Sequence, residues 1–265
     1  MNGIVLAIVA VSAIGLIAAV ILAVASKVMA VPVDERFGPV RECLPGANCG
    51  ACGYAGCDAY AQALVSGECT NGSLCIPGGA DSAKGIGEAL GLAVEDVKPM
   101  VAAVKCNGTC DNTFDKLEYQ SAKTCKGAKL FFGGKGTCTY GCMGLGDCAD
   151  VCPVNAIDMV NGIAHIDTDL CIGCGLCAKT CPNNVIEVIP FDYKIHVTCN
   201  SKDKGAVAMK NCKVSCIGCM KCQKACQYDA ITVVDSLAHI DQEKCTACGA
   251  CVEQCPKKCI HIVKK

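Results

Sequence analysis

The side chains that could do chemistry in this chain are cysteines, which make up 28 of its 265 residues. Thiols at this density fit a disulfide scaffold, a zinc protein or an iron–sulfur protein. Three runs share the spacing Cys-x2-Cys-x2-Cys-x3-Cys, and they begin at Cys171, Cys216 and Cys245. Zinc prefers paired cysteines separated by a longer spacer, often with histidine, whereas this spacing is typical of [4Fe–4S] clusters. The spacing therefore indicates iron–sulfur chemistry.

The cysteines belong to an internal duplication with a period of 74 residues. The sequence AHID at Ala164–Asp167 recurs at Ala238–Asp241, and Cys125 maps onto Cys199. Each of the following cysteines also has a counterpart 74 residues further on: Cys138, Cys142, Cys148, Cys152, Cys171, Cys174, Cys177 and Cys181. We therefore predict two tandem two-cluster ferredoxin-like modules, residues 125–198 and residues 199–265.

Each predicted module holds two cysteine runs, and in such modules the fourth cysteine of one run binds the cluster of the other run. The first run departs from this pattern, because Leu145 stands where the second copy has Cys219. We expect Cys138 to supply the missing ligand. The predicted ligand sets are Cys138, Cys142, Cys148 and Cys181; Cys152, Cys171, Cys174 and Cys177; Cys216, Cys219, Cys222 and Cys255; and Cys226, Cys245, Cys248 and Cys251.

A separate cysteine group precedes the duplication, in a small domain predicted over residues 43–80. Cys49, Cys52 and Cys57 come from one glycine-rich loop, and Cys75 returns from downstream as the fourth ligand of a [4Fe–4S] cluster. The segment after Cys57 has alanine and leucine at helical spacing, so we expect a helix there. Cys43 and Cys69 fall outside the compact spacing and are expected to be ordinary buried thiols.

These assignments predict five [4Fe–4S] clusters, and the remaining cysteines allow a sixth. Cys106 and Cys110 form a closely spaced pair that Cys125 could join. The fourth ligand of this extra site stays open between Cys199 and Cys212. Cys259 lies inside a predicted closing strand, where a packed thiol is the expected role.

Short strands and helices must position these cysteines, which gives an α+β fold class. Strands at 157–160 and 163–166 flank Asn161-Gly162, a strong hairpin signal. Strands at 231–234 and 237–240 flank Asp235-Ser236 in the same place of the second copy. Closing strands are predicted at 185–189 and 260–263. Residues 81–124 are predicted as a linker with a helix around 94–104.

The N-terminus carries a long uncharged segment. Residues 3–25 are 23 apolar or small residues, enough to cross a bilayer core as a helix. A cleaved signal peptide would need a basic start and a shorter apolar core. We therefore predict a single-pass anchor at residues 1–26 and a connector at 27–42. Lys27, Arg36 and Arg41 follow the span closely, which places the cysteine-rich part on the cytoplasmic side of the cell (inner) membrane. A reducing cytoplasm argues against disulfides.

Other function classes find little support in the sequence. The formal net charge is -1 and only 4% of residues are aromatic, so nucleic acid is not an expected partner. No G-x-G-x-x-G segment follows a predicted strand, and no phosphate-binding P-loop sequence occurs. No catalytic residue set is predicted. NAD or flavin chemistry must then belong to partner subunits.

Together these motifs resemble one family, the B subunits of Rnf respiratory complexes. The resemblance rests on an N-terminal span, LPGANCGACGYAGC from Leu44, CIPGG from Cys75, and doubled ferredoxin modules ending in CPKKCI from Cys255. It implies a membrane-anchored relay that takes electrons from reduced soluble ferredoxin. It also implies partner membrane and NADH/flavin subunits, which reduce NAD⁺ and move Na⁺ or H⁺. Two alternatives stay open: a module that reduces a cluster-containing regulator, and a scaffold that passes no electrons.

Overall fold

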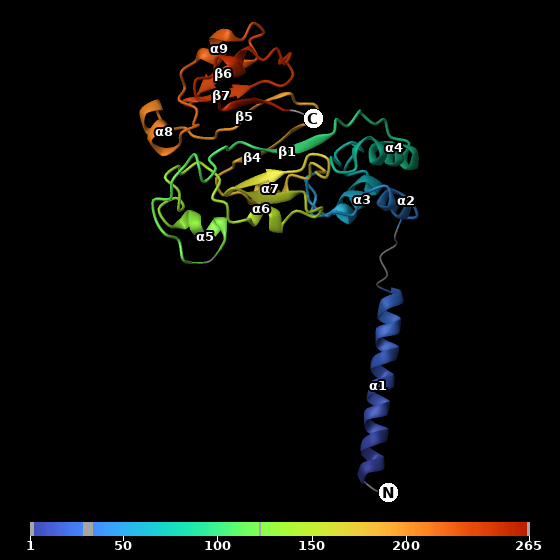
Figure 1. Cartoon of the computed structure of the whole chain (residues 1–265). Coiled ribbons are helices and arrows are strands. Elements are labelled where there is room, and N and C mark those ends of the chain that lie inside the picture. The colour runs from blue at the N-terminus through green and yellow to red at the C-terminus, as the bar shows by residue number, and fades with distance from the viewer. Residues whose placement is uncertain (1–2, 29–33, 122, 264–265) are drawn as a thin grey trace.

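The computed structural model describes residues 3–28, 34–121 and 123–263. The parts of the predicted anchor, connector, linker and second module at residues 1–2, 29–33, 122 and 264–265 lie outside the described residues. Within the described chain, one long helix precedes a folded part that holds all the cysteines (Figure 1). Helices and strands alternate in that part, as the predicted α+β class requires.

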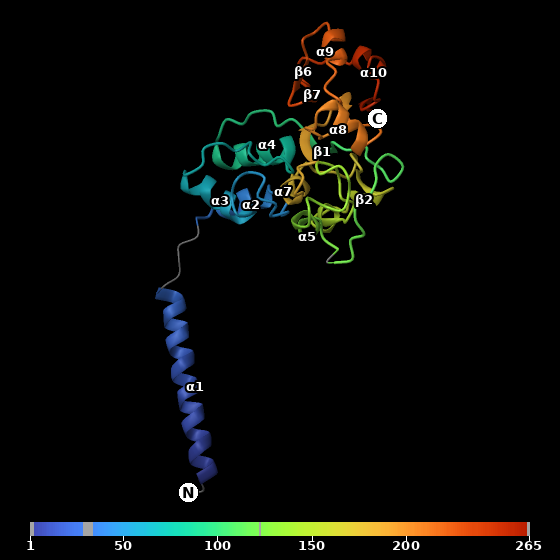
Figure 2. The ribbon, with the colours of Figure 1, turned by 90° about the vertical axis from the view of Figure 1, so that its left-hand side faces the viewer.

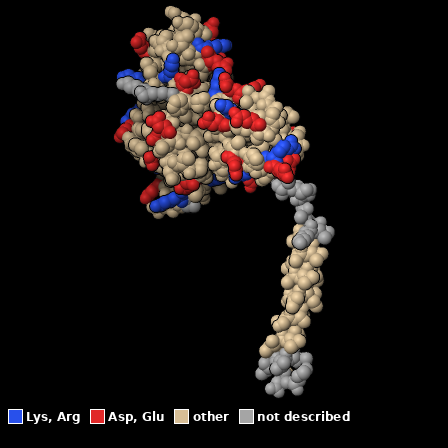
Figure 3. All heavy atoms as spheres, turned by 90° about the vertical axis from the view of Figure 1, so that its right-hand side faces the viewer, with Lys and Arg blue, Asp and Glu red and all other residues tan. Residues whose placement is uncertain are grey.

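Helix α1 (Gly3–Val28) has the properties of a membrane span. Residues Ile8–Ser26 form a stretch of 19 residues long and apolar enough to cross a membrane, and none of it is buried against the rest of the protein. Leu16 and Leu22 are about 70% exposed, a costly state for leucine in water. Figure 3 shows the coloured part of this helix as a column without charged side chains. A bilayer would cover these side chains.

Three helices form an N-terminal lobe: α2 (Phe37–Glu42), α3 (Cys57–Ser66) and α4 (Gly79–Leu90). Helix α3 confirms the helix predicted after Cys57, and it ends at Gly67, whose left-handed φ of 78° suits glycine. Val40, Tyr60 and Ile86, one from each helix, are fully buried together. This small core fixes the loop that carries the first cysteines.

The first module contains α5 (Cys125–Leu130), α6 (Asp147–Asp150), β2 (Ile157–Val160), β3 (Ile163–Ile166), α7 (Leu176–Thr180) and β4 (Ile186–Pro190). Strands β2 and β3 pair antiparallel as predicted, with Val160 opposite Ile163. Asn161 and Gly162 both have positive φ, 47° and 79°, as a type I′ hairpin turn requires.

The helix predicted around residues 94–104 is wrong. Helix α4 ends earlier, and Met100–Val104 is strand β1, which pairs antiparallel with β4. Val101, Ala102 and Ala103 are buried in succession, as in a strand covered on both faces. The apolar run between Pro99 and Cys106 is also too short for a stable helix.

The second module contains β5 (Ile195–Val197), α8 (Gly205–Asn211), α9 (Lys221–Ala225), β6 (Ile231–Val234), β7 (Leu237–Ile240), α10 (Ala250–Glu253) and β8 (Ile260–Ile262). Strand β5 lies within residues 125–198, the range predicted for the first module, but its partner strand belongs to the second. Strands β6 and β7 form the predicted hairpin, and β8 pairs with β5. Each closing strand therefore pairs with a strand that precedes its module's first cysteine. Figures 1 and 2 place α9 at the top of the folded part, well away from α2 and α3.

Backbone hydrogen bonds join the two modules along the segment after β1. The N–H of Asn107 donates to the carbonyl of Thr198 (3.1 Å), and that of Lys213 donates to Asn112 (2.8 Å). Thr113 also forms an isolated bridge with Cys212. The linker of the sequence analysis is thus the seam between the modules.

Candidate iron–sulfur sites

Four small cavities in the modules each bring together four cysteines from at least two chain segments, and Cys259 also lines one of them. Each is named here by one of its buried thiols. The four sets are the Cys148 cavity with Cys125, Cys142, Cys148 and Cys181; the Cys177 cavity with Cys152, Cys171, Cys174 and Cys177; the Cys222 cavity with Cys216, Cys219, Cys222 and Cys255; and the Cys251 cavity with Cys226, Cys245, Cys248 and Cys251. Three of these sets contain the four cysteines grouped together in the sequence analysis. Each brings the last cysteine of one run beside the other run.

The Cys148 cavity differs from the expectation at one position. Cys125 lines it, while Cys138, the expected substitute for the missing thiol at Leu145, lines another cavity. The carboxylate of Asp147, at the start of α6, accepts the backbone N–H groups of Cys125 (2.7 Å) and Lys126 (3.1 Å). This bond docks the first turn of α5 against α6. The N–H of Leu145 also donates to the Cys125 sulfur. Cys125 on α5 thus takes the place of the thiol that is missing at Leu145.

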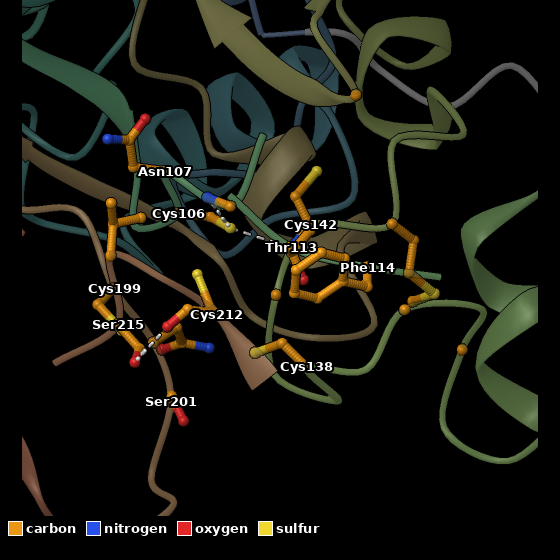
Figure 4. Close-up of a pocket in the computed structure, with 18 of the residues that line it drawn as sticks. Cys106, Asn107, Thr113, Phe114, Cys138, Cys142, Cys199, Ser201, Cys212 and Ser215 are labelled. Atoms are coloured by element: carbon orange, nitrogen blue, oxygen red, sulfur yellow. Dashed lines mark hydrogen bonds between the residues drawn. The ribbon is translucent and has the colours of Figure 1, made fainter. Parts of the chain in front are cut away.

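A cavity of about 380 Å³ lies at the seam between the modules and is called the interface cavity (Figure 4). Cys106 and Cys138 come from the first module, and Cys199 and Cys212 come from the second. Cys110 also reaches its lining but is exposed. The structure thus brings together both cysteines between which the sequence left the fourth ligand open.

The interface cavity has local two-fold character that the sequence period does not reveal. The N–H of Cys142 donates to the Cys106 sulfur, and the N–H of Cys216 donates to the Cys199 sulfur, both at 3.3 Å. A second pair of bonds is also equivalent in the two modules. The N–H of Lys105, directly before Cys106, donates to the carbonyl of Val185 (2.7 Å), and the N–H of Thr198, directly before Cys199, donates to the carbonyl of Cys259 (2.8 Å). Cys106 is therefore the structural counterpart of Cys199. Cys125, which the 74-residue shift assigns to that place, belongs to a segment that the second module lacks.

The N-terminal lobe gathers the group predicted ahead of the duplication, Cys49, Cys52, Cys57 and Cys75. Burial raises the pKa of the Cys75 thiol, and the nearby Cys57, Cys52 and Cys49 thiols raise it further. The N–H of Gly78 donates to the Cys75 sulfur and acts in the opposite direction. Four thiols therefore lie within electrostatic range of one another, and we call them the N-terminal set.

Burial disfavours thiolates in these sites unless a positive group joins them. Burial raises the pKa of Cys106 and of Cys148 to about 12, and that of Cys177, Cys199 and Cys222 to about 11. For Cys148, the neighbouring Cys142, Cys125 and Cys181 thiols add to this effect. Four sulfur ligands around one centre must all lose their protons. A cationic iron–sulfur core supplies the charge that offsets this cost, so the donor sets fit such a group.

Single-ion binding fits the geometry less well. Four thiolates on one zinc ion, at Zn–S of about 2.3 Å, would lie about 3.8 Å apart. Across residues 3–28, 34–121 and 123–263, no three Cys, His, Asp or Glu side chains converge closely enough to hold a single metal ion. The thiols instead surround cavities, the arrangement that a multinuclear cluster needs.

Backbone N–H groups also point at sulfur atoms, a hydrogen-bond pattern that tunes clusters. Ala102 donates to Cys171 (3.4 Å), and Ala156 donates to Cys152 (3.3 Å). Because Ala102 lies in β1, the strand that the sequence analysis missed contributes directly to the Cys177 cavity.

The six thiol sets follow one another through close contacts. The Lys179 ammonium group on α7 donates to the carbonyl of Gly50 (3.1 Å), which holds the loop of the N-terminal set beside the Cys177 cavity. Burial raises the pKa of Cys174, and the Cys49 thiol raises it further. The Cys106–Cys142 bond joins the interface cavity to the Cys148 cavity, and the Cys199–Cys216 bond joins it to the Cys222 cavity. Within each module, the two cavities share the two cysteine runs. The sets therefore form one continuous series.

The remaining cysteines play other parts. Cys43 donates to the carbonyl of Pro39 (3.2 Å) and Cys69 donates to that of Asn71 (3.5 Å), as packed thiols do. Cys259 is 2% exposed and lines the Cys222 cavity, with its sulfur 3.6 Å from that of Cys255. The Cys259 thiol lowers the pKa of Cys255 to about 5 and that of Cys216 to about 6 by hydrogen bonding, while its own pKa rises.

Comparison with known families supports this picture. Residues 44–77 match the Fe-S cluster family, residues 164–187 the 4Fe-4S binding domain, and residues 215–259 the 4Fe-4S dicluster domain. Iron–sulfur cluster domains are therefore present in all three parts of the folded chain.

Three curated relatives align over most of the chain. The B subunit of the proton-translocating ferredoxin:NAD(+) oxidoreductase complex of Clostridium ljungdahlii is 43% identical over 99% of this chain and 94% of its own length. The Na(+)-translocating counterpart of Acetobacterium woodii is 40% identical over 93% and 74%. The B subunit of the ion-translocating oxidoreductase complex of Methanosarcina acetivorans is 41% identical over 94% of each chain. The chain therefore belongs to the family of B subunits of ion-translocating ferredoxin:NAD⁺ oxidoreductase complexes, the Rnf complexes.

Proposed function

We propose that this chain is the membrane-anchored electron relay of an Rnf-type complex. It accepts electrons from reduced soluble ferredoxin and passes them to partner subunits, which reduce NAD⁺ and couple this to Na⁺ or H⁺ transport. The observation that carries the proposal is the series of six thiol sets, linked by the Lys179–Gly50, Cys142–Cys106 and Cys216–Cys199 hydrogen bonds.

Each thiol set holds one [4Fe–4S] cluster, which when bound supplies one-electron chemistry. The interface cavity takes the sixth cluster, and Cys125 replaces Cys138 in the Cys148 cavity. The proposed ligands are Cys49, Cys52, Cys57 and Cys75; Cys152, Cys171, Cys174 and Cys177; Cys125, Cys142, Cys148 and Cys181; Cys106, Cys138, Cys199 and Cys212; Cys216, Cys219, Cys222 and Cys255; and Cys226, Cys245, Cys248 and Cys251.

The protein's own contribution is to hold and tune these sites. Thiols from at least two segments close each module cavity, so folding and ligation depend on each other. Backbone N–H groups of Cys142, Cys216 and Ala102 donate to sulfur and favour the more negative, reduced state. Burial among Ile157, Ile186 and Ile231 limits water at the sulfur atoms.

The anchor and its flanking charges support a cytoplasmic location of the folded part. Arg36 and Arg41 follow α1 closely, and basic residues beside a span favour the cytoplasmic side. NAD⁺ and flavin are assigned to partner subunits, because the sequence carries no nucleotide-binding motif.

The test is an anaerobic titration of the full chain, loaded with clusters and held in detergent, with pre-reduced two-cluster ferredoxin. The proposal predicts uptake of about six electrons per chain, with the EPR signals of mutually interacting reduced clusters. If dithionite reduces the clusters and ferredoxin does not, the electron-donor part of the proposal fails. If neither reduces them, the relay itself fails.

A further inference from the structure

The most exposed thiols of the series lie in the second module. Cys219 of the Cys222 cavity and Cys248 of the Cys251 cavity are exposed, whereas Cys174, the counterpart of Cys248, is buried. Met220, next to Cys219, is 48% exposed and lines the same cavity. A soluble protein can therefore come closer to these two sites than to the buried first-module thiols.

The surroundings of the two exposed thiols differ in charge. Lys257 lines the Cys222 cavity with Cys219 and Met220. Lys221 and Lys224 lie one turn apart on α9, directly after Met220, and Lys258 follows Lys257. No acidic residue occurs in residues 213–228 or 254–263, which border this cavity. We call Lys221, Lys224, Lys257 and Lys258 the lysine face.

The ammonium groups of these four lysines have no acidic partner among the described residues. Among the described residues, no ion pair or side-chain hydrogen bond engages their ammonium groups. Lys244, near the Cys251 cavity, is instead 3.7 Å from Asp241, and Glu243 and Glu253 lie close to it in sequence. The N-terminal lobe has the opposite charge to the lysine face, because residues 34–98 include nine acidic and four basic residues. Positive charge without a partner is thus concentrated at one exposed site.

We propose that the lysine face, over Cys219 and Met220, is the docking surface for a small acidic one-electron carrier. Such a carrier is negative in part because each [4Fe–4S] core of about +2 is held by four thiolates. Opposite charges raise the rate of encounter, and this effect falls as salt is added. The α9 end lies well away from α2 and α3 of the N-terminal lobe (Figures 1 and 2). From the Cys222 cavity the series runs through the interface, Cys148 and Cys177 cavities to the N-terminal set, so entry here leaves only the Cys251 cavity off the direct path.

This inference rests on the proposed function and names its point of entry. The experiment reverses the charge of the lysine face in the cluster-loaded full chain by Lys221→Glu, Lys224→Glu, Lys257→Glu and Lys258→Glu. A matched control reverses four exposed lysines elsewhere, which have no ion pair among the described residues: Lys84, Lys98, Lys204 and Lys210. A third variant replaces the lysine face with arginine, which keeps the charge. Stopped-flow absorbance follows reduction by pre-reduced two-cluster ferredoxin and, separately, by an uncharged chemical reductant.

At low ionic strength, we expect charge reversal of the lysine face to lower the second-order rate constant with ferredoxin by about tenfold or more. The rate constants of the control and arginine variants with ferredoxin should stay within about threefold of that of the unaltered chain. The uncharged reductant should reduce all four proteins at the same rate. Equal loss in the lysine-face and control variants would overturn the inference, since only net charge would then matter. Loss of reduction by the uncharged reductant in the lysine-face variant would also overturn it, by locating the defect in the cluster. If ferredoxin failed to reduce the unaltered chain, the proposed function would fail, because ferredoxin would not be the electron donor.

Discussion

Cys125 and Cys138 occupy different cavities, and this difference decides which clusters depend on them. Asp147 fixes Cys125 through two N–H···O bonds, while Cys138 lies with Cys106 and Cys212 at the seam. We expect the double variant Cys138→Ala/Cys106→Ala to lose about four iron atoms per chain, because both thiols serve one cluster. The double variant Cys138→Ala/Cys148→Ala should lose about eight.

Iron analysis after anaerobic reconstitution measures both losses. A loss of about eight iron atoms in the first variant and about four in the second would mean that Cys138 is a ligand in the Cys148 cavity instead. The variant Asp147→Asn offers a milder check, because an amide accepts the two N–H groups more weakly than a carboxylate does. It should bind less iron at the same site than the unaltered chain.

Cys259 provides a second residue-scale prediction. Once Cys255 and Cys216 bind iron as thiolates, the buried Cys259 S–H can donate to them and stabilise the reduced state. Its counterpart 74 residues earlier is Val185, which is equally buried and cannot donate. We expect Cys259→Val to lower the midpoint potential of the cluster in the Cys222 cavity, and Val185→Cys to raise that of the cluster in the Cys148 cavity.

EPR-monitored redox titration of the two variants follows each potential. Shifts of the same sign in both variants would contradict hydrogen bonding by the Cys259 thiol as the cause.

At the scale of elements, strands β1 and β5 hold the modules together. His196 on β5 is buried, and its Nε2 donates to the carbonyl of Val104 at the end of β1 (3.2 Å). Burial lowers the pKa of His196, outweighing the opposing effect of Glu187, whose carboxylate lies 3.7 Å from Nδ1. Lys105 and His261 also face the ring and lower its pKa further.

This pKa shift predicts how stability depends on pH. Above the unfolded-state pKa of about 6.5, His196 is neutral in both states. As the pH falls below that value, the unfolded chain takes up a proton that the folded chain resists, so stability is lost. We expect His196→Gln, which keeps an N–H donor, to lose less Tm than the unaltered chain between about pH 7.5 and about pH 5.8. If thermal unfolding showed an equal loss of Tm in both proteins over this pH range, His196 would not be the cause of the pH dependence.

The same elements show what the sequence could and could not reveal. The hairpins, the closing strands and helix α3 follow from alternation, turn residues and periodicity, which are local signals. Strand β1 was missed because Met100–Val104 becomes a strand only by pairing with β4, about 86 residues away. The thiols of Cys106 and Cys199 were not matched because a segment present only in the first module breaks the 74-residue period there. The signal that could have aligned them is the shared pattern of a short apolar strand, one residue, then cysteine.

For the whole molecule, the interface cavity is the single connection between the modules in the proposed relay. We expect Cys106→Ala/Cys212→Ala to leave the second module reducible by ferredoxin while slowing electron arrival at the N-terminal set by more than about tenfold. The matched control is Cys110→Ala, because Cys110 reaches the same cavity but is exposed and unassigned. Freeze-quench EPR resolves the order in which clusters become reduced. Unchanged kinetics in the double variant would mean that electrons bypass the seam.

The central claim is that six thiol sets each hold a [4Fe–4S] cluster. Iron, acid-labile sulfide and zinc analysis of the full chain, isolated without oxygen, tests it most directly. The account predicts about 24 iron and 24 sulfide atoms per chain and negligible zinc. A fully loaded protein with about 16 to 20 iron atoms, or one containing zinc in their place, would contradict it.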